Sequence, residues 1–142
     1  MCQVTRENLI LNLNTMNAVV VDDDPSSLLV LSNQLKEMGI TPVCCQTVEA
    51  AIYRIFKFRP AFITLDLHLE ESDGIELLQI RRRVPEIHNI PIIVTSGESR
   101  SPIIAESILA GASAYLIKPI MTALLIEAIK KIGVKIPSKD IQ

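Results

Sequence analysis

The chain has 142 residues with a net charge of −2, 49% apolar residues and 21% charged residues. This length and apolar fraction predict one folded domain with a real core and exclude a disordered chain. The small net charge, 4% aromatic content and lack of Trp give no argument for binding nucleic acid or an anionic membrane.

The cysteines Cys2, Cys44 and Cys45 make a poor disulfide framework, because their number is odd and two of them are adjacent. In a strand, Cys44 and Cys45 would face opposite ways and act as small apolar side chains. No run reaches the ~18 apolar residues of a membrane span, and no secretory signal is recognisable at the start. We therefore expect a cytoplasmic protein that does not engage a membrane.

Taken along the chain, residues 1–15 are expected to be a mobile N-terminal extension. Apolar runs that predict strands then alternate with helical patterns. The predicted strands are 18–22, 41–46, 61–66, 91–96 and 114–117. Their nearly continuous apolar character is typical of parallel strands that are covered on both faces.

The predicted helices have recognisable ends, such as a capping residue followed by Pro at the start and Gly at the end. They run from Asp24-Pro25 to Gly39, from Val48 to Lys57, from Asp73-Gly74 onward, from Ser101-Pro102 to Gly111, and from Thr122 to Ile132. The expected buried positions are Leu28, Leu31, Leu35 and Met38, then Ala51, Ile52, Ile55 and Phe56, then Ile75, Leu77, Leu78 and Ile80. The run Arg81-Arg82-Arg83 predicts a solvated helix end.

Five strand–helix repeats predict an α/β domain with a doubly wound, five-stranded parallel sheet and helices on both faces. We expect this domain to cover residues 16–133. Residues 134–142 are too few for a second domain and are expected to be a C-terminal tail.

Ligands of such sheets bind outside the carboxyl ends of the strands. Four predicted strands end in polar residues that this topology would bring to one edge: Asp22 and Asp23, Asp66, Ser96, and Lys118. Neighbouring carboxylates repel each other by ~4 kcal/mol at close range, so a cluster of them suits a hard cation such as Mg²⁺. Asp24 is expected to cap the first helix instead.

Together a metal, an acceptor carboxylate, a hydroxyl and an ammonium describe a site for a transferable phosphoryl group. Each residue also has a plainer interpretation. The three acids at 22–24 can be capping or solvated residues, Lys118 a solvated strand end, and Ser96 part of a turn.

Four motifs carry a specific resemblance: VVVDDDP at 19–25, PAFITLDLHLEESDGIELL at 60–78, PIIVTSG at 91–97 and GASAYLIKP at 111–119. Over roughly residues 16–133 the sequence resembles the receiver domain of two-component response regulators, of the chemotaxis-regulator kind. The resemblance implies a flavodoxin-like strand order, 2-1-3-4-5.

The resemblance also implies roles for individual residues. Asp66 would be the phosphoacceptor. Asp23 and Asp66 would bind Mg²⁺ together with the backbone carbonyl of His68, and Asp22 would act through water. Lys118 would pair with phosphoryl oxygens, and the Lys118–Pro119 bond would be cis.

Two further residues would form the switch. Ser96 would supply the switch hydroxyl, chosen over the adjacent Thr95 because Ser96 keeps the family's spacing to Lys118 and precedes Gly97. Tyr115 would be the switch aromatic. The chain departs from the family at Leu69-Glu70, where a Met-Pro pair is usual, which puts the phosphoryl lifetime in doubt. The His68 side chain is expected to be an exposed loop residue.

We expect a switch that catalyses only its own phosphorylation and dephosphorylation. A sensor histidine kinase or phosphotransfer protein would supply the phosphoryl group. The fourth helix, the fifth strand (114–117) and the fifth helix would then repack for a downstream effector or a second copy of the chain. Ile103, Ile120 and Met121 lie near this face but are equally compatible with the core.

Three alternatives remain. One is an interaction module of the same fold that is never phosphorylated. Another is a small phosphatase that uses Asp66 as nucleophile. Such an enzyme would need a general acid close after the nucleophile, and position 68 is His where an Asp would be expected. The last is a flavin carrier, although no phosphate-binding loop follows the first strand.

Overall fold

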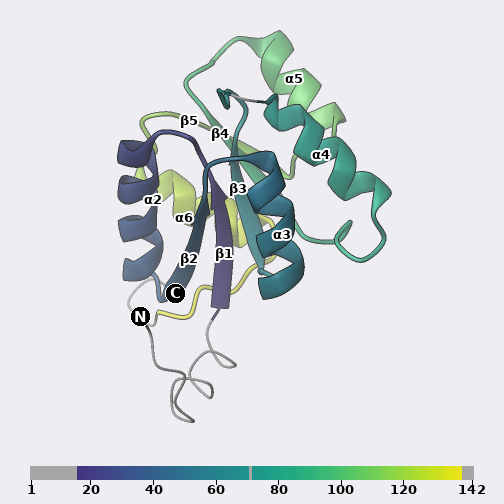
Figure 1. Ribbon diagram of the computed structural model, residues 1–142. Coiled ribbons are helices and arrows are strands. Elements are labelled where there is room, and N and C mark those ends of the chain that lie inside the picture. Colours follow the sequence, from purple (N-terminus) through teal and green to yellow (C-terminus); the bar gives the residue numbers. More distant parts are fainter. Residues whose placement is uncertain (1–15, 71, 139–142) are drawn as a thin grey trace.

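The computed structural model describes residues 16–70 and 72–138. Its sheet contains five parallel strands in the order β2-β1-β3-β4-β5, which confirms the predicted doubly wound fold (Figure 1). The strands are β1 (Met16–Val21), β2 (Ile40–Cys45), β3 (Phe62–Asp66), β4 (Ile92–Ser96) and β5 (Ala114–Ile117). The helices are α2 (Pro25–Glu37), α3 (Val48–Phe58), α4 (Gly74–Arg83), α5 (Ser101–Leu109) and α6 (Thr122–Lys131).

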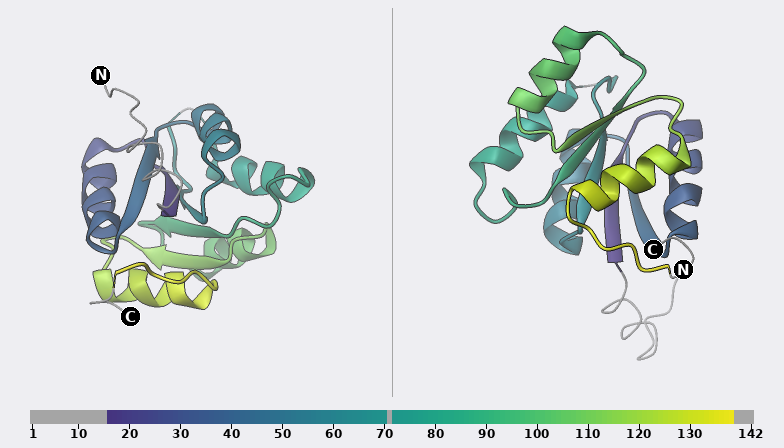
Figure 2. Two further views of the ribbon diagram at one scale, coloured as in Figure 1. Left: turned by 90° about the horizontal axis from the view of Figure 1, so that it is seen from below. Right: turned by 180° about the vertical axis from the view of Figure 1, so that it is seen from behind.

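Two apolar clusters cover the two faces of the sheet. Successive side chains of a strand point to opposite faces, so Val19 and Val21 join one cluster while Ala18 and Val20 join the other. The first cluster lies under α3 and α4, with Ile103 of α5 packed against it. The second lies under α2 and α6, which Figure 2 shows together on the opposite side of the sheet.

Most of the predicted buried positions are confirmed, but some helix details differ. Phe56 was expected to be buried and is 38% exposed, because Ala51 and Ile55 already fill the contact between α3 and the sheet. Ser101 was expected to cap α5, but Arg100 occupies the cap position, without a side-chain cap hydrogen bond, and Ser101 begins the helix. β5 was expected to be covered on both faces and is only half-buried, because it is an edge strand.

The prediction of a solvated arginine run is wrong for Arg81, which is buried. Its guanidinium donates to the carbonyls of His88 (2.8 Å), Ile90 (3.0 Å) and Gly111 (2.6 Å). These carbonyls lie in the turns that precede β4 and β5, where the backbone has no strand partner for them. Arg82 is exposed but also donates, to the carbonyl of Leu109 at 2.6 Å.

Both cysteines of the described residues are free, as expected. Cys44 is half-buried and Cys45 is buried, and burial raises the pKa of the Cys45 thiol to about 12. Cys2 lies outside the described residues. Among the described helices, none combines the length and the apolar character needed to cross a bilayer.

The domain limits predicted from the sequence stay predictions. Residues 1–15 and 139–142 lie outside the described residues. Beyond residue 133 the chain continues along the fold: Ile136 is buried in the second cluster, and the Ser138 amide donates to the Met38 carbonyl.

Gly74 allows α4 to begin directly against the end of β3. Its amide donates to the Leu67 carbonyl at 3.0 Å. A Cβ at this position would lie 2.7 Å from the Asp66 carbonyl oxygen and 2.8 Å from the Leu67 Cα. Both of these atoms belong to the backbone and cannot move aside cheaply, so the close approach requires glycine.

Replacing Gly74 by Ala should therefore lower the free energy of unfolding by roughly 1–3 kcal/mol, as overpacking does. Gly97→Ala is the matched control, because an added Cβ there would meet nothing within 4 Å. Urea unfolding followed by circular dichroism measures both. Equal stability of the two variants would contradict the close-approach argument.

Candidate functional site

Three carboxylates gather where β1 and β3 end side by side. Asp22 and Asp23 directly follow β1, and Asp66 is the last residue of the neighbouring β3. One oxygen from each carboxylate lies within 4.8 Å of the others. Asp22 and Asp66 are buried and Asp23 is half-buried. The predicted convergence of these three residues is confirmed.

Backbone amides of the flanking loops orient each carboxylate. Asp22 Oδ1 accepts from the Asp24 amide at 3.0 Å, and Asp66 Oδ1 accepts from the His68 amide at 3.0 Å. Asp23 Oδ2 accepts from the Glu70 amide at 2.6 Å. Since an amide donor favours the charged form of a carboxylate, the loops help to hold negative charge at this edge.

Lys118 supplies the positive charge of the site. Its Nζ lies 2.6 Å from Asp22 Oδ2 and 3.1 Å from Asp66 Oδ2. The residue follows β5, and its amide donates to the Ser96 carbonyl at 2.8 Å, which ties it to the end of β4. The Lys118–Pro119 peptide bond is cis, as predicted.

The ion pairs have opposing effects on the two partners. Burial is the largest influence on Asp22 and raises its pKa, although the hydrogen bond from Lys118 works in the other direction. Burial alone would lower the pKa of Lys118, but the hydrogen bond to Asp22 and the charges of Asp66 and Asp22 together raise it. Lys118 therefore carries its charge at neutral pH.

Asp24 has the different role that the sequence predicted for it. It caps α2, accepting from the Ser26 amide at 3.2 Å and from the Ser27 hydroxyl at 2.9 Å. These hydrogen bonds, the one from Ser27 foremost, lower the pKa of the Asp24 carboxyl. Asp24 is thus a structural neighbour of the carboxylate cluster.

The loop after β4 brings together the two residues predicted to form the switch. Ser96 is buried, and its hydroxyl accepts from the Glu98 amide at 3.1 Å. Tyr115 is half-buried and its hydroxyl donates to the Glu98 carbonyl at 2.6 Å. The side chain of Glu98 in turn forms an ion pair with Arg100 at 2.7 Å.

Sequence reasoning missed Glu98, which connects Ser96, Tyr115 and Arg100. Its only sequence signal is its position two residues after Ser96. Gln34 of α2 was also missed. Its amide nitrogen donates to the Ile120 carbonyl and to the Thr122 hydroxyl, both at 3.0 Å, and so fixes the loop that follows Lys118. Nothing in the sequence pattern distinguishes it from a solvated helix residue.

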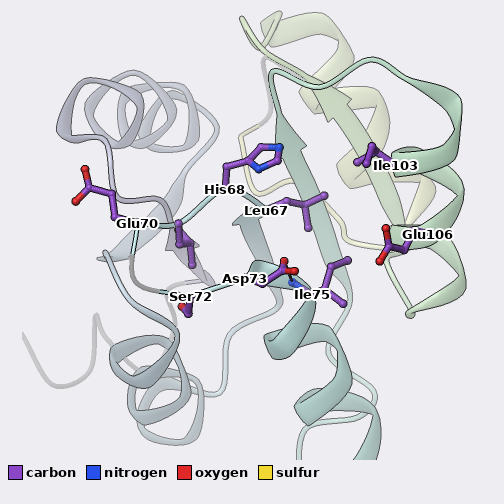
Figure 3. Close-up of a pocket in the computed structure, with 9 residues that line it drawn as sticks. Leu67, His68, Glu70, Ser72, Asp73, Ile75, Ile103 and Glu106 are labelled. Carbon is purple, nitrogen blue, oxygen red and sulfur yellow. Dashed lines mark hydrogen bonds between the residues drawn. The ribbon is translucent and has the colours of Figure 1, made fainter.

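A hollow of about 550 Å³ lies beside the carboxylates, between the loop after β3 and α5. Figure 3 shows Ile103 and Glu106 of α5 facing Leu67 and Ile75 across it. His68, Glu70, Ser72 and Asp73 complete its rim together with Leu69. The hollow includes none of the clustered carboxylates, so it borders the site without forming part of it. The His68 side chain is exposed there, as expected.

The residues present fit a hard divalent cation. Carboxylate oxygens are the ligands that Mg²⁺ prefers, and three of them converge here. Three carboxylates against one ammonium leave a negative site, which attracts a cation. No sulfur or imidazole donor belongs to the cluster, so a zinc site of the usual composition is not indicated within the described residues.

Replacing Lys118 by Met should lower the free energy of unfolding by roughly 2–3 kcal/mol at about pH 7 without divalent ions, because two buried carboxylates lose their counter-charge. The deficit should shrink toward about pH 4. Burial already raises the pKa of Asp22, so this carboxyl becomes neutral, and needs no counter-charge, as the pH falls. Urea unfolding at both pH values measures the effect.

Lys131→Met is the control, because it removes an exposed lysine that pairs with Glu127 at 3.0 Å. Such a surface pair contributes less than about 1 kcal/mol. Similar losses in the two variants would show that Lys118 does not balance a buried charge.

Comparison with known proteins supports the resemblance of the sequence motifs. Residues 18–130 match the family model described as "Response regulator receiver domain". The two-component response regulator ORR21 of Oryza sativa subsp. japonica is 36% identical over 107 residues, which are 74% of this chain and 15% of that protein. ARR2 of Arabidopsis thaliana, also a two-component response regulator, is 30% identical over 119 residues, or 82% of this chain and 17% of that protein. The chain thus matches less than a fifth of the length of these relatives.

Solved structures agree with the fold. A two-component response regulator from Clostridium difficile superposes with a TM-score of 0.77 at 26% identity, covering 87% of this chain and 100% of the other. The chemotaxis protein CheY4 of Vibrio cholerae has a TM-score of 0.77 at 21% identity, covering 83% and 98%, and shows the fold alone. The carboxylate cluster and Lys118 thus lie in a domain that other proteins share. The chain belongs to the response regulator receiver domain family.

Proposed function

We propose that this receiver domain is a switch that accepts a phosphoryl group on Asp66 in a Mg²⁺-dependent reaction. The single observation that supports it most is the Lys118 ammonium, which bridges Asp22 and Asp66 within a cluster of three carboxylates. The positive Lys118 can pair with an anionic phosphoryl group, and the carboxylates can bind the cation that accompanies that group.

In the transfer, an Asp66 carboxylate oxygen attacks phosphorus and the P–N bond of a phosphohistidine breaks. The donor would be a sensor histidine kinase or a phosphotransfer protein. The imidazole leaves with the electron pair of that bond. The Lys118 ammonium, now beside Asp66 Oδ2 at 3.1 Å, would pair with a phosphoryl oxygen.

Asp23 and Asp66 would hold Mg²⁺ with the backbone carbonyl of His68, and Asp22 would act through a water molecule. When bound, the ion would neutralise charge on the phosphoryl oxygens. Glu70 adds a carboxylate to this rim where the family usually has Pro. Its amide, rather than its side chain, contacts Asp23.

Ser96 would be drawn toward the phosphoryl group and would release the Glu98 amide that its hydroxyl now binds. Tyr115 contacts the same residue, so the loop between β4 and α5 would respond as a unit. The neighbouring surface of α5, β5 and α6 exposes apolar side chains suited to an effector or a second copy of the chain. They are Ile108, Leu109, Ile117, Met121 and Leu124.

Of the three apolar residues considered for this surface, Met121 is 62% exposed and remains available to a partner. Ile103 and Ile120 are partly buried against the two core clusters. We propose further that residues 16–133 form the switching unit, that residues 1–15 and 134–142 flank it, and that it works in the cytoplasm. It would be a signalling module that catalyses only its own phosphorylation and dephosphorylation.

Incubation with acetyl phosphate and Mg²⁺ should add one phosphoryl group to the native protein and none to Asp66→Asn, because only the carboxylate can act as nucleophile. Intact-mass spectrometry measures the adduct. Asp24→Asn, which keeps a capping side chain one residue beyond the site, should be modified like the native protein.

An adduct that persists in Asp66→Asn would assign the acceptor to another residue. No adduct in any variant, together with no Mg²⁺ binding, would favour the alternative function, a receiver-like interaction module that works without phosphorylation.

Mg²⁺ binding should weaken about tenfold or more in Asp23→Asn, because one negatively charged oxygen ligand is lost. Asp24→Asn should bind as the native protein does, since Asp24 caps α2. Isothermal titration with MgCl₂ measures both. An equal loss in the two variants would indicate that general negative charge, rather than a defined site, attracts the ion.

A further inference from the structure

The two ends of α5 are attached to different parts of the fold. At its N-terminal end, Arg100 makes no side-chain cap, and the preceding loop is held through Glu98 by Ser96 and Tyr115. At its C-terminal end, the carbonyls of Leu109 and Gly111 accept hydrogen bonds of 2.6 Å from Arg82 and Arg81 of α4. The switch residues therefore reach only one end of this helix directly.

The C-terminal end of α5 needs these arginines for an electrostatic reason. The last turn of a helix presents unpaired carbonyls and partial negative charge, which cations stabilise. The other four helices carry basic residues in their own last turns, whereas α5 has none. The missing charge comes from α4. Arg81, in turn, pairs with no carboxylate among the described residues and donates only to carbonyls.

The arrangement of Arg81 leaves little room for independent movement. The side chain is 9% exposed and joins three carbonyls from two separate turns. Gly111 has φ of +115°, and a Cβ there would lie 2.8 Å from Arg81 Nη2. The guanidinium thus packs directly against the turn that ends α5.

The opposite end of α4 lies against the proposed acceptor. Gly74 begins the helix so close to the Asp66 carbonyl that no side chain fits between them. Leu77 and Leu78 fix the middle of the helix in the core with no exposed surface. A ten-residue helix packed in this way is a rigid element, so a displacement at one end would reach the other.

We propose that α4 is a second mechanical link between the acceptor site and α5, with Arg81 and Arg82 as its distal anchor. The N-terminal end of α5 follows Ser96 and Tyr115 through the loop at 97–100, and its C-terminal end follows α4. Ile108 and Leu109, 45% and 77% exposed, lie at the end that α4 controls. This inference rests on the proposed function and adds a route to the partner surface that bypasses the switch hydroxyl and aromatic.

Hydrogen exchange measured by mass spectrometry tests the link. The amides of Ala110, Gly111 and Ala112 donate to the Glu106, Ile108 and Ser107 carbonyls and so report on the anchored end. In the unmodified protein, Arg82→Ala should speed exchange in peptides covering 105–113 by about tenfold, because a charged hydrogen bond to the last turn is lost. Arg82 is exposed, so this variant is expected to fold.

Arg83→Ala is the matched control. Arg83 is the next arginine of the same helix end and is exposed, and its side chain makes no hydrogen bond or ion pair among the described residues. It should exchange like the native protein. Faster exchange in both variants, or in neither, would contradict the proposal that Arg82 anchors the C-terminal end of α5.

The link itself is tested with acetyl phosphate and Mg²⁺, using intact mass to confirm the adduct in each sample. In the native protein, phosphorylation should change exchange at both ends of α5. Arg82→Ala should keep the response near 101–104 and lose it in 105–113, whereas Tyr115→Phe should do the reverse. A C-terminal response that persists in Arg82→Ala would overturn the second route. A native protein that neither takes a phosphoryl group nor binds Mg²⁺ would instead contradict the proposed function. The comparison of the unmodified variants would still test the anchoring role of Arg82.

Discussion

The Lys118 ammonium lies between Asp22 and Asp66 and balances charges that would otherwise repel across a buried edge. Two carboxylates with oxygens within 4.8 Å of each other disfavour the folded state unless a cation accompanies them. The strand order satisfies this requirement by placing β1, β3 and β4 next to one another and β5 at the edge beyond. The lysine reaches back over the end of β4, to which its own amide is bonded. The Gln34 contacts and the parallel register of β4 and β5 support this placement.

The contacts at this edge of the sheet also restrict the surrounding loops. Each carboxylate uses one oxygen on a backbone amide of a neighbouring loop, and Asp22 and Asp66 each use the other on Lys118. An incoming cation or phosphoryl group would therefore compete with contacts that already exist. Rearrangement of the site and rearrangement of its loops are coupled for this reason, and the Glu98 contacts extend the coupling to α5.

The sequence was informative where a local rule determines position. Asp22, Asp23, Asp66 and Lys118 each follow an apolar run, and parallel topology alone brings strand ends to one edge. Asp24 followed by Pro25 identified a cap for the same reason. Ser96 and Tyr115 were located by motif, and the structure adds the Glu98 contacts that join them.

The failures concern long-range contacts. The environment of Arg81 depends on carbonyls up to 30 residues away, and the charge run alone carries no sign of them. Phe56 has the right helical spacing for burial, but Ala51 and Ile55 already fill the contact between α3 and the sheet. Ser101 precedes Pro102 as a capping residue would, yet the cap position of α5 falls one residue earlier, at Arg100. The preceding loop, which Tyr115 contacts at Glu98, is not visible in that local pattern.

The segment after α6 completes one face of the sheet. Ile136 fills the cluster under α2 and α6, and Ser138 bonds to the end of α2. The cluster on this face of the sheet therefore needs side chains from Ala18 to Ile136, and so from nearly the whole length of the domain. The cluster on the opposite face includes no residue beyond Tyr115. The two faces of a single sheet therefore become complete at different points along the chain, and a truncation before Ile136 would remove part of one core cluster while leaving the other whole.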